Sequence, residues 1–173
     1  MYKSHPANSL VAVVDNLGDF KEAAHNTDFR AVLLPAEQTE LGIDFPLDTA
    51  KQAEPIKFLS LKAGDVVNLA GICKEIKDAL HILVCAYSDI TGTQTPVLNF
   101  ANINYTRAHS HDIPVLSCAF LGSGSVWYGE DGSPIINNPG DVIFMKPSFK
   151  HNSPTNPGSQ DRRVCTLSKS LGN

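Results

Sequence analysis

The chain has 173 residues, of which 42% are hydrophobic and 18% are charged, and its formal net charge is −4. This length and composition are typical of one soluble globular domain and exclude a disordered chain. No Lys/Arg-rich run is present, and every apolar stretch is far shorter than the ~18 residues of a membrane span. We therefore expect neither nucleic acid nor a membrane as a partner. Because the first residues lack a signal-peptide pattern, we also expect a cytoplasmic protein.

The first 60 residues mix extended and helical signals. Residues 10–14 and 30–34 are short apolar runs typical of buried strands. Between them, residues 20–25 are expected to form a brief helix, with Asn16 or Asp19 as its N-cap. Residues 36–55 are polar and interrupted by prolines, which indicates a surface loop.

From residue 56 onward the strand signals become denser. Short apolar runs alternate with clusters of turn residues, a pattern typical of a β-sandwich or barrel. Residues 74–80 could form a helical turn, but their neighbours favour extension. The predicted strands cover residues 56–61, 66–69, 81–87, 97–106, 115–121, 125–128, 141–145 and 163–168.

A set of histidines is the main candidate for chemistry. His109 and His111 are one residue apart, so on a strand they point to the same face. His151 follows the turn Pro139-Gly140-Asp141 and a later strand, which could bring a third imidazole to that face. Three neutral imidazoles can hold a divalent transition metal and leave positions open for a substrate.

The segment 97–155 resembles the two sequence motifs of the cupin superfamily. The first motif contains the His-x-His pair and a later glycine, and the second contains Pro-Gly-Asp, a proline and a final histidine. The resemblance implies an all-β fold, a double-stranded β-helix or jelly roll, with a metal bound by His109, His111 and His151. On this basis we expect residues 61–173 to form the barrel. Residues 1–60 would be a mixed α/β extension that packs on it.

The chain departs from the cupin motif where a glutamate ligand is expected. Alignment on Gly122 places that glutamate at Val115, and alignment on Gly124 places it at Ser117. Asp112 follows His111 directly, so strand alternation should point it away from the histidines. Ser148 stands where the second motif has a late glycine. We therefore expect three histidine ligands and no acidic ligand.

This ligand set resembles that of the three-histidine cupin dioxygenases. The resemblance implies a non-heme Fe(II) dioxygenase that acts on a small, anionic organic molecule. Two alternatives stay open. One is a non-oxidative lyase or isomerase of the same fold that uses Zn, Ni or Mn. The other is a cupin that binds or senses a ligand without catalysis.

The neighbours of the histidine pair suggest further roles. If the strand is regular, Arg107 and Tyr105 share the face of His109. Arg107 could pair with a substrate carboxylate or be an exposed residue at a strand end, and Tyr105 could donate a proton or fill the barrel.

The four cysteines are widely spaced, and we expect them to be free thiols. Strand alternation also predicts which residues form the wall of the cavity. If Val115 occupies the glutamate position, Cys118 faces away. The expected lining residues are then Val115, Ser117, Ala119 and Leu121. Since cupins commonly pair through sheet edges, we expect a homodimer.

Overall fold

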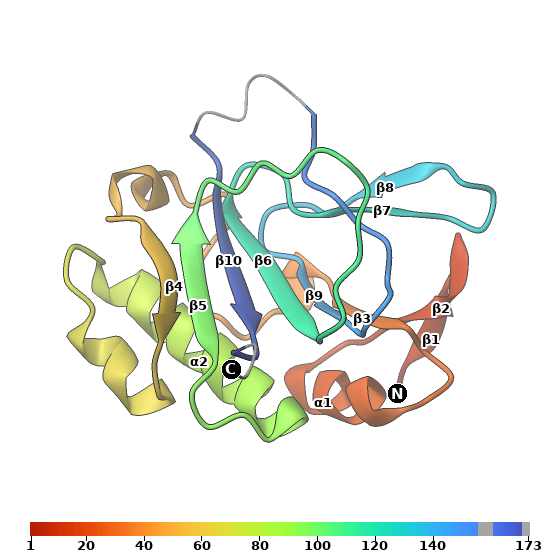
Figure 1. The fold of residues 1–173 in the computed structure, drawn as a ribbon, viewed down its shortest axis with the longest axis horizontal. Helices are drawn as coiled ribbons and strands as arrows, with labels where there is room; N and C mark the ends of the chain where they lie inside the picture. The colour runs from red at the N-terminus through yellow and green to blue at the C-terminus, as the bar shows by residue number, and fades with distance from the viewer. Residues whose placement is uncertain (156–160, 171–173) are drawn as a thin grey trace.

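The computed structural model describes residues 1–155 and 161–170, and these form a mostly β fold with two α-helices (Figure 1). The helices are α1 (Leu17–His25) and α2 (Lys74–Thr91). Three short 3-10 helices are η1 (Ala36–Gln38), η2 (Asp48–Gln52) and η3 (Ala63–Asn68). The strands are β1 (Lys3–His5), β2 (Asn8–Val13), β3 (Ala31–Leu34), β4 (Ile56–Ser60), β5 (Val97–Ala101), β6 (Val115–Leu121), β7 (Val126–Tyr128), β8 (Pro134–Ile136), β9 (Val142–Met145) and β10 (Arg163–Ser168).

One large mixed sheet organises the chain. Its eight strands follow the order β1-β2-β3-β9-β6-β10-β5-β4, while β7 and β8 form a separate two-stranded sheet. β2 and β3 run parallel, and the other neighbouring strands of the large sheet are antiparallel. Residues 1–60 therefore contribute β1 to β4 to the same sheet as the histidine-bearing half of the chain.

The long helix α2 corrects the sequence analysis, which favoured extension over 74–80 and a strand over 81–87. Its buried positions recur every three or four residues, from Ile76 through Leu80 and Leu83 to Tyr87 and Ile90. The continuous apolar run from 82 to 87 obscured this period, because such a run fits a strand or a helix equally well. Gly92 ends the helix in the left-handed conformation, with φ 71°.

Other strands also differ from the prediction. Residues 66–69 lie largely in η3, and the strand predicted over 97–106 stops at Ala101. β1 and β8 were not predicted, since each has only three residues. The predicted strands 115–121 and 163–168 are confirmed as β6 and β10.

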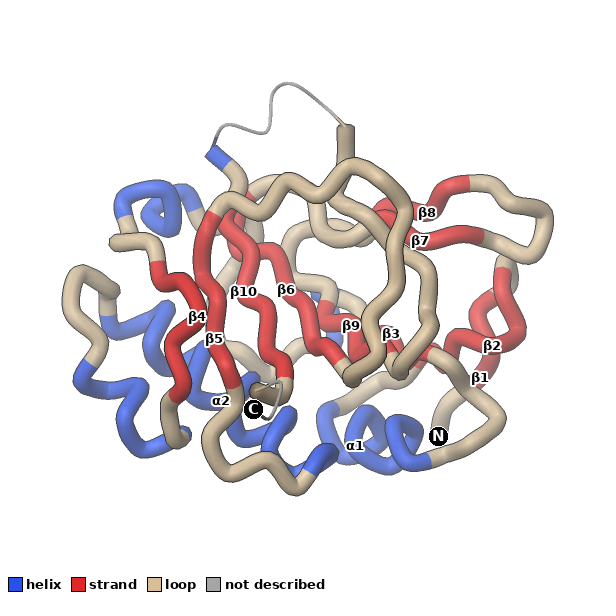
Figure 2. Tube along the Cα trace, viewed as in Figure 1, coloured by secondary structure: helices blue, strands red, loops and turns tan. Residues whose placement is uncertain are grey.

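The large sheet separates two environments. On one face, apolar side chains of β5, β6, β9 and β10 pack against α1 and α2 in the main core. Figure 2 shows α2 behind the left-hand strands of the sheet. A smaller cluster on the other face contains Trp127 of β7, packed with Val115, Ile143 and Met145. The rest of that second face borders a cavity.

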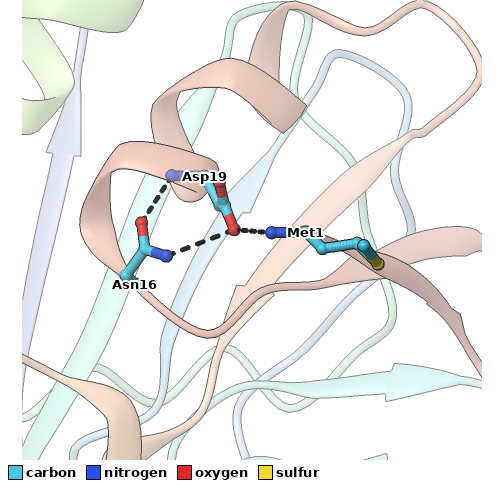
Figure 3. A network of polar contacts seen from close by, with 3 residues as sticks. All are labelled: Met1, Asn16 and Asp19. Carbon is cyan, nitrogen blue, oxygen red and sulfur yellow. Dashed lines mark hydrogen bonds and ion pairs between the residues drawn. The ribbon is translucent and has the colours of Figure 1, made fainter.

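The N-terminal helix is held by local polar contacts (Figure 3). Asn16 is its N-cap, and its Oδ1 accepts a hydrogen bond from the backbone N–H of Asp19 at 2.8 Å. The Asp19 carboxylate accepts from Asn16 Nδ2 at 3.2 Å and also pairs with the amine of Met1. The predicted helix is therefore confirmed, and Asn16 rather than Asp19 is its N-cap.

No helix in the described part of the chain is both long enough and apolar enough to cross a membrane.

Candidate metal centre

The three histidines come from two segments that run side by side (Figure 1). His109 and His111 lie in the connection between β5 and β6, and His151 follows β9. The backbone N–H of His109 donates to the carbonyl of His151, and that of His151 donates to the carbonyl of His109, each at 2.9 Å. Directly opposed residues of an antiparallel pair have side chains on the same side, so this bridge brings two imidazoles together.

A third backbone hydrogen bond joins the same two segments at His111. Ser148 donates its N–H to the carbonyl of His111 at 2.9 Å. Ser148 has φ 70°, in the left-handed region where glycine is favoured. Ser148 stands where the resemblance to the cupin motif placed a late glycine, and its backbone adopts a conformation that glycine favours.

The Pro-Gly-Asp turn has a structural role that explains its glycine and its aspartate. Gly140 has φ 86°, and a Cβ there would lie 2.3 Å from the ring of Phe45. The buried carboxylate of Asp141 accepts N–H bonds from Ala36 at 2.7 Å and Asn138 at 2.8 Å. Its pKa is nevertheless raised, because the effect of burial outweighs these bonds. The turn fixes the start of β9, the strand that leads to His151.

The three rings form a compact cluster. Their centroids are 4.5 Å apart for His109 and His151, and 5.0 Å apart for the two pairs that include His111. One nitrogen from each ring lies within 4.8 Å of the other two. A single ion can therefore bind all three with modest adjustment of the side chains, since metal–nitrogen bonds are about 2.0–2.1 Å long.

Two of the rings are oriented by their own backbone. His109 Nδ1 lies 2.9 Å from the carbonyl of Arg107, and His151 Nδ1 lies 3.0 Å from the carbonyl of Phe149. A carbonyl only accepts, so each Nδ1 carries a proton, and in the neutral form of the ring Nε2 then has the lone pair that can bind a metal. This second contact to a backbone carbonyl is the usual support of a metal-binding histidine.

Burial favours the neutral form of His151 and His111. The pKa of His151 is lowered to about 4, mainly by burial, with repulsion from the other two histidines adding to the effect. The pKa of His111 is also lowered, first by burial and then by His109, while Asp112 opposes the shift. Neutral imidazole is the form that binds a metal, so these two side chains are ready to act as ligands near neutral pH.

The cluster lies in the wall of a cavity of about 770 Å³. Val115 and Ser117 line this cavity, as predicted. These are the two positions at which the alignments placed the glutamate of the cupin motif, and neither residue has a carboxylate. Cys118 faces the helices instead, again as predicted, and all four cysteines are free thiols. Asp112 is exposed and is not part of the cavity wall.

The predicted lining is wrong for the last part of β6. Ala119 and Leu121 are not among the lining residues, and Leu121 packs in the main core. The pairing of β6 with β10 shifts between Arg163 and Val164, so Leu121 no longer follows the alternation that begins at Val115.

The two residues predicted to assist the histidines have different surroundings. Tyr105 lines the cavity, and its ring centroid is 5.9 Å from that of His109, although the residue is 65% exposed. Arg107 is exposed and does not line the cavity. Its observed contribution is the backbone carbonyl that orients His109. The roles predicted for both side chains stay predictions.

Arg162 is a site residue that the sequence analysis missed. It lines the cavity, yet it is only 2% exposed. It stands directly before β10, where an arginine in a polar segment looks like an ordinary surface residue. Its burial depends on chain segments distant in sequence, and no local signal pointed to it.

The comparisons with known proteins give only partial similarities. No protein-family model matches the chain, and no curated protein matches it. Among solved structures, an acireductone dioxygenase from Bacillus anthracis with a cadmium ion in its active centre matches at a TM-score of 0.41 and 14% identity. That match covers 65% of this chain and 76% of the other.

Two further structures overlap more of the chain. The non-heme alpha-ketoglutarate-dependent epimerase SnoN from nogalamycin biosynthesis has a TM-score of 0.44 and 7% identity, over 88% of this chain and 81% of that one. A 2OG-Fe(II) oxygenase family oxidoreductase from Burkholderia pseudomallei has a TM-score of 0.40 and 13% identity, over 88% of both chains. The three-histidine cluster expected from the cupin resemblance is present in this chain.

Proposed function

We propose that this protein is a metal-dependent enzyme of the cupin type that acts on a small anionic organic molecule. Within that class, we propose a non-heme Fe(II) dioxygenase with three histidine ligands. The observation that carries the proposal is the cluster of His109, His111 and His151, with two Nδ1 atoms held by backbone carbonyls at 2.9 and 3.0 Å. A jelly-roll description of the fold belongs to the same proposal.

The donor set fits a first-row divalent transition metal. Imidazole nitrogens suit Fe, Zn, Ni and Cu, whereas Mg and Ca prefer oxygen ligands. The described residues offer no carboxylate in the cluster, so a bound ion would keep its full charge of +2. That charge favours an anionic ligand in the remaining positions. The metal would supply Lewis acidity and, if it is iron, the ability to activate O2.

The protein residues around the cluster would bind the substrate and limit access of water. Apolar side chains of Ile113, Val115 and Met145 line the cavity together with the histidines. They can exclude bulk water and so strengthen electrostatic interactions in the site. Ser117 and Ser125 add hydroxyl groups, whose oxygens lie 3.2 Å apart, and these can position a polar substrate group.

Metal analysis of the protein, purified without an affinity tag or added metal, tests the proposal. We expect near-stoichiometric iron in the wild type and its loss in His111→Ala. His25→Ala is the matched control, because His25 is an exposed residue of α1. Equal metal content in wild type and His111→Ala, or no uptake by either protein on reconstitution, would refute the metal site.

The metal that is found separates the dioxygenase from its alternatives. Zinc, nickel or manganese, with turnover unchanged when O2 is removed, would support the lyase or isomerase. An enzyme that loses turnover under anaerobic conditions would support the dioxygenase. A bound metal with no turnover of any small organic acid would favour a ligand-binding or sensing protein. The homodimer and the cytoplasmic location also stay proposals.

A further inference from the structure

Arg162 carries a buried positive charge at the rim of the large sheet. Its Nε donates to the carbonyl of Ser123 at 2.6 Å, and its Nη1 donates to the carbonyl of Ile103. Its side chain lies over Gly122, where a Cβ would be 3.2 Å from Arg162 Cγ. The guanidinium is therefore fixed between the segments that follow β5 and β6.

These contacts do not neutralise the charge. Both acceptors are neutral backbone carbonyls, and within the described residues no acidic side chain lies within ion-pair distance of Arg162. A buried guanidinium is costly unless an anion compensates it. Burial lowers the pKa of Arg162 to about 10, so the side chain still carries its charge at neutral pH.

The cavity that Arg162 lines has an unusual charge pattern for this chain. The whole protein has a net charge of −4. None of the described residues that line the cavity is acidic, whereas Lys57, Arg162 and Lys169 are basic. Lys57 is exposed and Lys169 half-buried. Arg162 is the buried cation of the three, and a buried charge is screened least by solvent.

Arg162 is also connected to the histidine segment. The Ile103 carbonyl that accepts from Arg162 also accepts from Ser153 Oγ at 2.9 Å. Ser153 is two residues beyond His151, and its N–H donates to the carbonyl of Tyr105 at 2.7 Å. The guanidinium and the metal candidate thus belong to one hydrogen-bonded wall of one cavity.

We propose that Arg162 binds a carboxylate of the substrate, so that the ligand is a small organic acid held between this guanidinium and the histidine cluster. This assigns to Arg162 the role that strand alternation suggested for Arg107. The inference rests on the proposed function, because it takes the histidine cluster to be a metal site. A second oxygen donor of the ligand would then reach the metal. A volume of about 770 Å³ suits a metabolite-sized molecule.

The test is a titration of the full chain with glutarate, and with glutaramide as a neutral probe of similar size. It is done on the protein as purified and again after metal removal, so that metal coordination and arginine binding are separated. We expect saturable glutarate binding without metal and none for glutaramide. Arg162→Gln should weaken glutarate binding about tenfold or more, the usual effect of losing a charge-assisted pair.

Arg163→Gln is the matched control. It removes the same charge from the neighbouring residue, whose Nη2 donates to the carbonyl of Lys51 outside the cavity. We expect this variant to bind glutarate as the wild type does. Equal binding by Arg162→Gln, weakening in Arg107→Gln instead, or no glutarate binding at all would overturn the inference.

A measurement on the wild type covers the case in which Arg162→Gln does not fold. The chain has four arginines, so their Nε–Hε signals can be assigned individually by NMR. Glutarate should shift the Arg162 signal and leave that of Arg163 in place. A failed metal analysis with a positive titration would overturn the proposed function alone. Stoichiometric metal with no shift at Arg162 would overturn this inference alone.

Discussion

The two faces of strand β6 differ in what their residues do. Leu116, Cys118 and Phe120 point to the helices and are almost fully buried in the main core. Val115 and Ser117, on the alternate positions of the same strand, line the cavity beside the histidines. One face contributes stability through close packing, while the other keeps polar groups and open volume. The comparison indicates that substitutions one residue apart should affect different properties.

The largest effect on stability is expected from Phe120→Ala on the helix-facing side. The Phe120 ring meets Phe45 and Phe100 edge to face, with centroids 5.7 and 5.1 Å away. Its loss would leave a cavity in the core, which typically costs about 3–5 kcal/mol. Urea unfolding measures the change. The folded fraction should keep its metal content, and a loss of metal without a loss of stability would contradict the division between the two faces.

Acidification tests the cavity side. In metal-free protein the pKa of His151 is about 4 when folded, below the ~6.5 expected when unfolded. As pH falls, the unfolded chain takes up this proton first, so the free energy of unfolding should decrease between about pH 7 and pH 4. His151 should lower the free energy of unfolding by about 2–3 kcal/mol in total, and the decrease ends once the folded side chain is also protonated.

Urea unfolding at a series of pH values isolates this contribution when wild type and His151→Gln are compared. Acidic groups elsewhere affect both proteins equally, so only the difference between the two curves reports on His151. Parallel curves over the whole range would mean that the folded and unfolded pKa values do not differ.

A smaller effect of opposite sign is expected from Ser148→Gly. Ser148 adopts φ 70° while its N–H holds the carbonyl of His111. A non-glycine residue in this conformation is disfavoured by about 1–2 kcal/mol, so glycine removes this cost. The greater backbone freedom of glycine in the unfolded chain opposes part of that stabilisation. We expect a stabilisation of up to about 1 kcal/mol by thermal or urea unfolding. Destabilisation would show that the serine side chain makes a contribution of its own.

The smallest effect on stability is expected from Ser117→Ala on the cavity side. The substitution removes the acceptor of the 3.2 Å hydrogen bond from Ser125 and leaves no large void. We expect a loss of no more than about 1 kcal/mol, well below that of Phe120→Ala. A cost as large as that of Phe120→Ala would show that the cavity face is as tightly packed as the helix face.

The sequence predicted the residues of the candidate site better than the elements that carry them. His109, His111 and His151 do meet, because their spacing places two imidazoles on one side of an extended segment. The pair was expected at the end of a strand over 97–106, but that strand ends at Ala101, and the histidines lie in a connection with an isolated bridge to His151. Side chains alternate along an extended backbone whether or not it belongs to a sheet. The prediction that the two histidines share a face therefore holds, although the predicted element was wrong.

Local pattern limited the helix cap to Asn16 or Asp19, and it determined most of the strands, the Pro-Gly-Asp turn and the absence of an acidic side chain at Val115 and Ser117. Tertiary structure decided which apolar run became the helix α2 and where the alternation of β6 ends. It also decided that Arg162 is buried while Arg107 is exposed. The physical reason is that periodicity and turn chemistry act over a few residues. Burial depends on segments far apart in the chain, such as those of Ile103, Ser123 and Arg162, which the fold brings together.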